Sequence, residues 1–245
     1  MTTTRPLKAI VLAAGRGKRM RPLSDTCPKP LLEVHGKPLI AWHIEALARS
    51  GVREIVINTD WLEERIVIAI GDGARFGVAI TYSMEGRDHG GALETAGGIA
   101  KALPLLGDAF WIVSADIFAP DFRFSEAAAE RFVASDRLAQ LWLVPNPSFH
   151  PGGDFGLGDD GLGLAEGAGP DGQRWTYANI ALARATLLAG VVPGSHAPLA
   201  PLLYAGMRER RIAAEIYRGR WDNVGTPAQL AELNAREGLS RTSAS

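Results

Sequence analysis

The 245-residue chain is poor in three features that would each define a class of protein. Cys27 is its one cysteine, so no disulfide can form within the chain, and nothing else in the sequence suggests secretion. No apolar run approaches the ~20 residues that a membrane-spanning helix needs. The 26 Lys and Arg residues are balanced by 27 Asp and Glu residues, which excludes the overall positive charge typical of nucleic-acid-binding proteins. These absences predict an ordinary globular protein of the cytoplasm, with neither a membrane nor a nucleic acid as partner.

Short apolar runs alternate with helical patterns through the first 145 residues. The runs at residues 7–12, 54–57, 110–113 and 138–144 predict buried strands. Two apolar stripes at helical spacing lie between them: Ile40, Ile44 and Leu47, which follow Pro38 and stop at Gly51, and Leu62, Ile66 and Ile70, which stop at Gly71. This alternation predicts an α/β fold with a mostly parallel sheet flanked by helices.

The remaining residues have a different composition. Residues 145–172 are dense in Gly, Pro and Asp, which predicts hairpins and binding loops. Strands are expected at 175–182 and 213–217, and helices at 199–207 and 227–236. We therefore predict one domain over residues 1–238, in which a part at about 7–145 is followed by a β-rich lobe and a closing helix at about 146–238. Residues 239–245 are expected to form a disordered tail.

A glycine-rich, basic segment follows the first predicted strand. Residues 16–37 hold six cationic and two acidic side chains, a local charge of +4 in a chain whose total is −1. Glycine lets backbone N–H groups approach a phosphate closely, and the cations would neutralise it. Two standard phosphate motifs are absent, because a P-loop would need glycine at Leu12 and a dinucleotide fingerprint would need it at Met20. The segment predicts an anionic ligand; a glycine turn with a solvated basic face is the alternative.

An acidic residue follows another predicted strand. Asp116 comes just after the apolar run at 110–113, which places it at the same sheet edge as the basic loop. Carboxylate oxygens suit Mg²⁺, which usually takes one or two protein ligands together with waters and phosphates. From spacing alone, Asp116 could equally cap the next helix.

The string LAAGxGxRMxPL at 12–23, followed by PKPLL at 28–32, resembles the signature of the sugar-phosphate nucleotidyltransferases. The similarity runs to about Leu233 and implies a Rossmann-like fold of the nucleotide-diphospho-sugar transferase type. It also implies that the loop wraps a nucleoside triphosphate. Ala13, Ala14, Gly15 and Gly17 would lie against the nucleotide, Arg19 would bind its phosphates, and Lys29 would act on the phosphate under attack. Arg19 and Lys29 are thus the expected catalytic cations.

The same resemblance implies a metal site and a base-reading segment. Asp116 would be the main ligand of Mg²⁺, with a partner near 219–227. There this chain has Asn223 where one common family form has Asp, and Asp222 one place earlier, so both are candidates. The base-reading segment resembles residues 93–98, with Glu85 upstream, which implies nucleotide contacts from Glu85, Glu94, Thr95 and Gly98. A flexible glycine loop before a helix is the alternative.

The segments LETAGG at 93–98, PNPSFHPGGDF at 145–155 and WTYANI at 175–180 look most like uridylyltransferases of cell-wall recycling that act on N-acetylmuramic acid 1-phosphate. That likeness implies sugar contacts from Asp154, Glu166 and Asn179, although Asp154 and Asn179 could equally be turn and cap residues. The expected substrates are UTP and the sugar 1-phosphate, joined with release of pyrophosphate. The alternatives are a guanylyltransferase for mannose 1-phosphate, another hexose-1-phosphate nucleotidyltransferase, and a non-catalytic nucleotide-sugar sensor.

Overall fold

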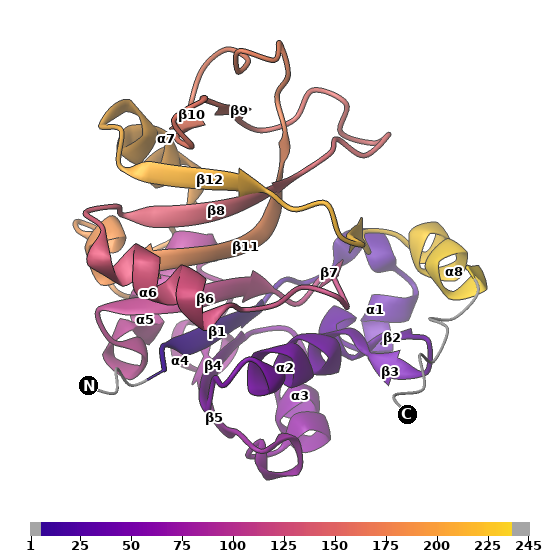
Figure 1. Ribbon diagram of the computed structural model, residues 1–245. Coiled ribbons are helices and arrows are strands. Elements are labelled where there is room, and N and C mark those ends of the chain that lie inside the picture. Colours follow the sequence, from indigo (N-terminus) through magenta and orange to yellow (C-terminus); the bar gives the residue numbers. More distant parts are fainter. Residues whose placement is uncertain (1–5, 237–245) are drawn as a thin grey trace, which may run out of the picture.

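The computed structural model of the protein describes residues 6–236, so the tail predicted at 239–245 lies outside the described residues. A seven-stranded sheet forms its centre, in the order β12-β8-β11-β6-β1-β4-β5 (Figure 1). Its strands are β1 (Lys8–Ala13), β4 (Glu54–Thr59), β5 (Ala79–Met84), β6 (Ala109–Ser114), β8 (Ala139–Val144), β11 (Thr176–Arg184) and β12 (Ile212–Ile216). Within the sheet only the pairings of β11 with β6 and β8 are antiparallel, which confirms the predicted mostly parallel sheet.

Strand β5 is the one strand of this sheet that the apolar runs did not predict. Its residues lie at the sheet edge beside β4, and Ala79 and Thr81 are exposed while Ser83 is the one buried side chain. An edge strand that buries so little needs no continuous apolar run, so its sequence carries a weak strand signal. The other strands fall within one or two residues of their predicted positions.

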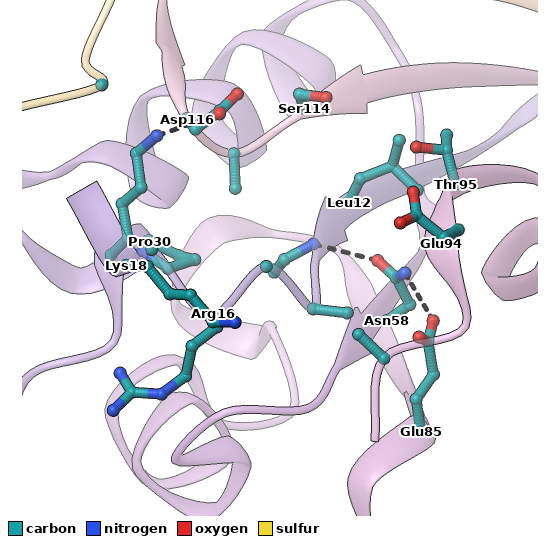
Figure 2. Close-up of a pocket in the computed structure, with 18 of the residues that line it drawn as sticks. Leu12, Arg16, Lys18, Pro30, Asn58, Glu85, Glu94, Thr95, Ser114 and Asp116 are labelled. Carbon is teal, nitrogen blue, oxygen red and sulfur yellow. Dashed lines mark hydrogen bonds and ion pairs between the residues drawn. The ribbon is translucent and has the colours of Figure 1, made fainter. Parts of the chain in front are cut away.

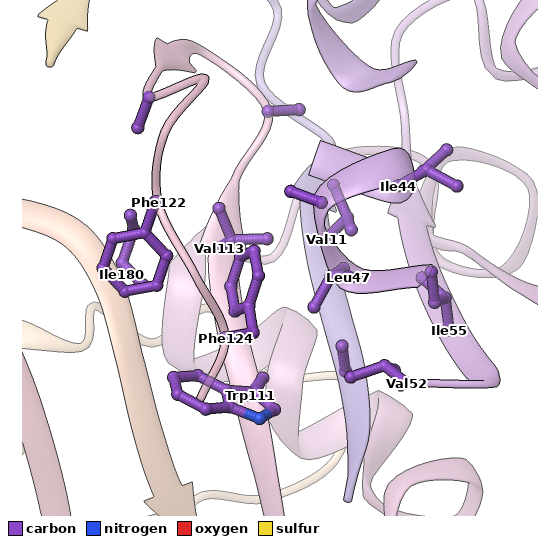
Figure 3. Close-up of a cluster of buried hydrophobic side chains, with 14 of the residues drawn as sticks. Val11, Ile44, Leu47, Val52, Ile55, Trp111, Val113, Phe122, Phe124 and Ile180 are labelled. Atoms are coloured by element: carbon purple, nitrogen blue, oxygen red, sulfur yellow. The ribbon is translucent and has the colours of Figure 1, made fainter. Parts of the chain in front are cut away.

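Helices cover both faces of the sheet, as predicted. The α-helices of the described residues are α1 (Leu23–Thr26), α2 (Leu39–Arg49), α3 (Glu63–Ile70), α4 (Glu85–His89), α5 (Glu94–Leu106), α6 (Glu126–Ala134), α7 (Ala200–Arg208) and α8 (Pro227–Ala235). Side chains of α2, α3 and α6 pack on one face, where Ile44 and Leu47 meet Val11 and Ile55 (Figure 3). Helices α5 and α7 pack on the other face with Ile10. Neighbouring residues of β1 thus pack into the apolar clusters on opposite faces of the sheet, because side chains alternate between the two faces of a strand.

The segment at 145–172, predicted to form hairpins and binding loops, is built mainly of turns, whereas β11 and β12 after it belong to the central sheet. It holds one small hairpin, β9 (Gly156–Leu157) with β10 (Gly163–Leu164), which stands beyond β12 in Figure 1. A bridge between Leu162 and Ala213 ties this segment to β12. Within residues 6–236, no helix is both long and apolar enough to cross a membrane.

Two further ribbons complete the fold, one of which joins distant segments while the other is a local hairpin. Strand β7 (Ile117–Phe118) pairs with β13 (Asp222–Asn223), and β2 (Glu33–Val34) pairs with β3 (Lys37–Pro38). Helix α8 follows β13 and packs on this end through a third apolar cluster that includes Met20, Phe118 and Leu233. Helix α8 is therefore held beside the loop that follows β1.

Burial of His43 in α2 predicts that acid weakens the fold. Its ring is 2% exposed, and Nε2 lies 2.8 Å from the carbonyl oxygen of Ile117. Burial lowers the pKa of His43 from 6.5 to about 4. Between these values the unfolded chain binds a proton that the folded chain does not, so stability falls as the pH drops below about 6.5. From pH 7 to pH 5 this group alone should remove about 2 kcal/mol from the free energy of unfolding.

Urea unfolding at both pH values measures the effect. His43→Gln keeps an amide that can donate to the Ile117 carbonyl but has no group that titrates in this range. Between pH 7 and pH 5, the free energy of unfolding of the variant should fall by about 2 kcal/mol less than that of the wild type. An unchanged pH dependence in His43→Gln would contradict the assignment.

Candidate active site

Two adjoining cavities lie at the carboxyl ends of β1, β4 and β6. The first has a volume of about 560 Å³ and the second about 550 Å³. They share part of their lining, namely Leu12, Arg19, Glu94, Thr95 and Ser114. This sheet edge is where open α/β sheets bind ligands. The molecule therefore presents one cleft with two compartments, which we call the first and second cavity.

The loop after β1 forms one wall of the first cavity (Figure 2). Ala13, Ala14 and Gly15 line it, together with Gly17. Gly17 has a φ of +62°, and a Cβ there would lie 3.2 Å from Cβ of Lys29. Glycine thus permits both the left-handed backbone and the close approach of the loop to Lys29. The structure places these four predicted residues together, as the motif implied.

Contacts with Trp61 and Ser24 also hold the basic loop in place. The guanidinium of Arg16 lies 3.3 Å from the ring centroid of Trp61, whose Nε1 donates a 2.8 Å hydrogen bond to the Ser24 carbonyl. Ser24 in turn donates through Oγ to the carbonyl of Gly17, at 2.8 Å. Trp61 was not singled out from the sequence, because an isolated tryptophan after a strand carries no signal of this role.

Lys29 and Asp116 meet across the cleft. The two residues are 87 positions apart in the chain, yet Nζ of Lys29 lies 2.9 Å from Oδ2 of Asp116. The Lys29 side chain is 9% exposed, and Pro28 and Pro30 restrict the backbone on either side of it. The Asp116 carboxylate is 39% exposed and so remains open to a further ligand. Both residues line the first cavity, at the sheet edge where the sequence placed them.

Strand β13 distinguishes between the two candidate partners of Asp116. The backbone N–H of Val224 donates to the carbonyl of Asp116 at 3.0 Å, which brings Asn223 beside it. Oδ1 of Asn223 is buried without a hydrogen-bond partner among the described residues. Asp222 instead forms a 2.6 Å ion pair with Arg236. Asn223 lines the second cavity, whereas Asp222 does not line it and is engaged by Arg236.

These oxygens suit a hard divalent cation. A buried amide oxygen that lacks a donor is costly unless a ligand satisfies it, and Asn223 offers such an oxygen one residue before Val224, which bonds the Asp116 backbone. A Cβ at Gly225 would lie 3.4 Å from Oδ1 of Asn223 and 3.5 Å from a guanidinium nitrogen of Arg19, so this glycine keeps the space between them open. No group of three or more His, Cys, Asp or Glu side chains in residues 6–236 forms a metal site, so phosphates and waters would complete the coordination.

The start of α5 forms the opposite wall of the cleft. Glu94 and Thr95 line both cavities, and Glu94 holds a φ of +63°, which is unusual for a residue with a side chain. Glu85 lines the first cavity but is fully buried, and Gly98 is not among the lining residues. The four residues predicted to contact the nucleotide, Glu85, Glu94, Thr95 and Gly98, therefore lie close together. Glu85 and Gly98 support this wall from the protein interior. His196 also lines the first cavity and was not singled out from the sequence.

The second cavity collects two of the three predicted sugar residues. Asp154 and Asn179 line it together with aromatic side chains, namely Phe149, Tyr177, Tyr204 and Trp221. The Asp154 carboxylate accepts from the backbone N–H of Tyr177 at 2.8 Å and lies 3.0 Å from Nε2 of His150. Glu166 is not among the lining residues; its side chain is 78% exposed and pairs with Arg208 at 2.7 Å.

Known proteins are similar to this chain in sequence and in fold. Residues 8–153 match the family model described as nucleotidyl transferase. An N-acetylmuramate alpha-1-phosphate uridylyltransferase of Neisseria meningitidis serogroup B is 46% identical over 234 residues, which cover 95% of this chain and 99% of that protein. One of the same name from Caulobacter vibrioides is 32% identical over 94% of this chain and 97% of that protein.

A solved structure from Bacillus anthracis, described as a glucose-1-phosphate thymidylyltransferase in complex with sucrose, has the same fold. It superposes with a TM-score of 0.78 at 20% identity and covers 94% of each chain. The fold agreement and the two full-length relatives confirm the resemblance carried by residues 12–32. The chain belongs to the nucleotidyl transferase family.

Proposed function

We propose that the protein transfers the uridylyl group of UTP to N-acetylmuramic acid 1-phosphate, with release of pyrophosphate. The observation that carries this proposal is the 46% identity, over nearly the full length of both chains, to a relative named for that activity. The two-compartment cleft supports it, because the reaction needs a nucleotide site and a sugar-phosphate site that open onto each other.

The first cavity is the proposed UTP site. Backbone N–H groups of the loop at Ala13–Gly17 and the Arg19 guanidinium suit a triphosphate, since glycine exposes the backbone and arginine neutralises the phosphate charge. Glu94 and Thr95 at the start of α5 are placed to contact the nucleotide from the opposite wall. In this arrangement the part at about 7–145 binds the nucleotide, and the part at about 146–238 binds the sugar.

Asp116 and Asn223 are the proposed ligands of Mg²⁺, because one oxygen is charged and accessible and the other is buried without a donor. When bound there, the ion would act as a Lewis acid that withdraws charge from the phosphate oxygens. Asp222 remains engaged with Arg236 and is left out of the proposed ligand set.

The chemistry then requires positioning and charge neutralisation. An oxygen of the sugar 1-phosphate attacks the α-phosphorus of UTP, and the bond to pyrophosphate breaks. The attacking phosphate is already ionised near neutral pH, so no general base is needed. Lys29, held rigidly between two prolines beside Asp116, can neutralise two phosphates that would otherwise repel each other.

The second cavity is the proposed sugar site. Asp154 and Asn179 offer acceptors and donors to sugar hydroxyls, and the surrounding aromatic rings exclude water. Glu166 would have to leave Arg208 and approach the cavity to take the sugar contact expected of it, so the proposal rests on Asp154 and Asn179. We place the reaction in the cytoplasm and in the recycling of cell-wall sugar.

A grid of substrates tests the proposal. Four nucleoside triphosphates are each paired with the 1-phosphates of N-acetylmuramic acid, N-acetylglucosamine, glucose and mannose, and pyrophosphate release is followed with Mg²⁺ present. UTP with the muramic acid derivative should give the highest kcat/KM, since a site built around hydrogen bonds can reject analogues by up to ~10⁴-fold. A preference for GTP with mannose 1-phosphate would reassign the substrates. Nucleotide binding without pyrophosphate from any pair would indicate a sensor.

A further inference from the structure

A buried chain of hydrogen bonds connects the two walls of the first cavity. The backbone N–H of Ala13 donates to Oδ1 of Asn58 at 2.9 Å, and Nδ2 of Asn58 donates to Oε1 of Glu85 at 2.7 Å (Figure 2). The backbone N–H of Leu93 donates to the other oxygen, Oε2 of Glu85, at 2.8 Å. Ala13 begins the phosphate loop and Leu93 directly precedes Glu94, so the link joins the segments that we assign to the phosphates and to the base.

The link is closed to solvent and tightly enclosed. Asn58 is 3% exposed and Glu85 is 0% exposed. A Cβ at Gly98 would lie 2.3 Å from Oε1 of Glu85 and 2.8 Å from Nδ2 of Asn58, so glycine is required there by packing against the link. Burial raises the pKa of the Glu85 carboxyl, and its hydrogen bonds to Leu93 and Asn58 oppose that rise.

The partners fix the orientation of each group. Ala13 offers only a donor to Asn58, so the amide must turn its oxygen to Ala13 and its nitrogen to Glu85. Both oxygens of Glu85 then accept. A glutamate in a wholly apolar setting would be expensive to bury, but here each oxygen is satisfied.

We propose that Asn58 and Glu85 are positioning residues that set the spacing between the phosphate loop and the start of α5, and thereby the affinity for the nucleotide. Neither residue needs to touch the ligand. This inference rests on the proposed function only in taking the first cavity as the nucleotide site.

Variants that exchange the donor and acceptor groups of Asn58 and Glu85 provide the test. In Glu85→Gln no orientation of the two amides satisfies Ala13, Leu93 and each other, because two N–H groups must face each other somewhere. Asn58→Asp brings two carboxylates together, which can share a hydrogen bond only by taking up a proton. The double variant Asn58→Asp/Glu85→Gln reverses the central bond, keeps the net charge and again lets both backbone N–H groups find an acceptor.

We expect each single variant to raise the Kd for UTP about tenfold or more, since a buried group left unsatisfied costs a factor of that order. The double variant should return to within about threefold of the wild type. The KM for the sugar 1-phosphate at saturating UTP should stay unchanged in all three. Calorimetric titration with UTP and Mg²⁺ in the absence of sugar measures the Kd directly.

Leu106→Ala serves as the control for general destabilisation. Leu106 is 2% exposed at the far end of the same helix, α5, so its truncation should lower the unfolding temperature and leave the Kd for UTP unchanged. Single variants that bind UTP like the wild type, or a double variant no better than the singles, would overturn the proposal. If the wild type binds another nucleotide in preference, the proposed substrate is wrong, and the same variants test the link with that nucleotide. A wild type that binds no nucleotide would overturn both.

Discussion

Lys29→Ala should lower kcat at least about a hundredfold and change the Kd for UTP much less. The ammonium lies 2.9 Å from Asp116 in the lining of the first cavity, where by our proposal it would face the charge that develops during transfer. A group that stabilises charge mainly in the transition state affects turnover more than binding. Steady-state kinetics with UTP and the sugar 1-phosphate, followed by pyrophosphate release, give kcat. Equilibrium titration gives the Kd.

Arg19→Ala is the matched comparison for Lys29→Ala. Arg19 lines both cavities and carries the same charge, but its assigned role is to hold the phosphates of the bound nucleotide. Its loss should chiefly weaken nucleotide binding. Near wild-type turnover in Lys29→Ala, or the same pattern in both variants, would remove the catalytic assignment of Lys29.

Asp116→Asn should abolish Mg²⁺-dependent turnover while the chain stays folded. The substitution keeps the size of the side chain and an oxygen that can accept from Lys29, but it removes the negative charge that attracts a divalent cation. Activity is measured over a range of Mg²⁺ concentrations, with thermal unfolding to check the fold. Full activity in excess chelator would contradict the metal mechanism.

Variants of the neighbouring pair refine this expectation. Asn223→Ala should raise the Mg²⁺ concentration needed for half-maximal activity, but by less than Asp116→Asn, because Asn223 contributes a neutral oxygen. Asp222→Asn should leave that concentration nearly unchanged, since Asp222 is paired with Arg236 and does not line either compartment of the cleft. A larger effect at Asp222 than at Asn223 would reverse the assignment.

The sequence predicted what depends on local pattern. The glycines and cations of residues 15–31 predict a phosphate loop because each would act through its own backbone or charge. The position of Asp116 follows from the end of a buried strand. Both predictions are local, and the structure places Lys29 and Asp116 together at the expected sheet edge.

What the sequence left open depends on partners far along the chain. The choice between Asp222 and Asn223 depends on which one faces the cleft and on Arg236, 14 residues after Asp222. Glu166 is drawn to the exposed Arg208, 42 residues later, which no local pattern indicates. Asn58 was not noticed at all, since a lone amide at a strand end gains its role only when Ala13 and Glu85 fold against it.

The products formed from UTP and N-acetylmuramic acid 1-phosphate test the central claim most directly. Phosphorus NMR of a reaction with the purified protein and Mg²⁺ follows both substrates and products in one sample. If the sugar phosphate attacks the α-phosphorus, one UDP-sugar should appear for each pyrophosphate released, and both substrates should disappear at equal rates. Formation of UMP with pyrophosphate, of UDP with free phosphate, or of no product at all would contradict the account.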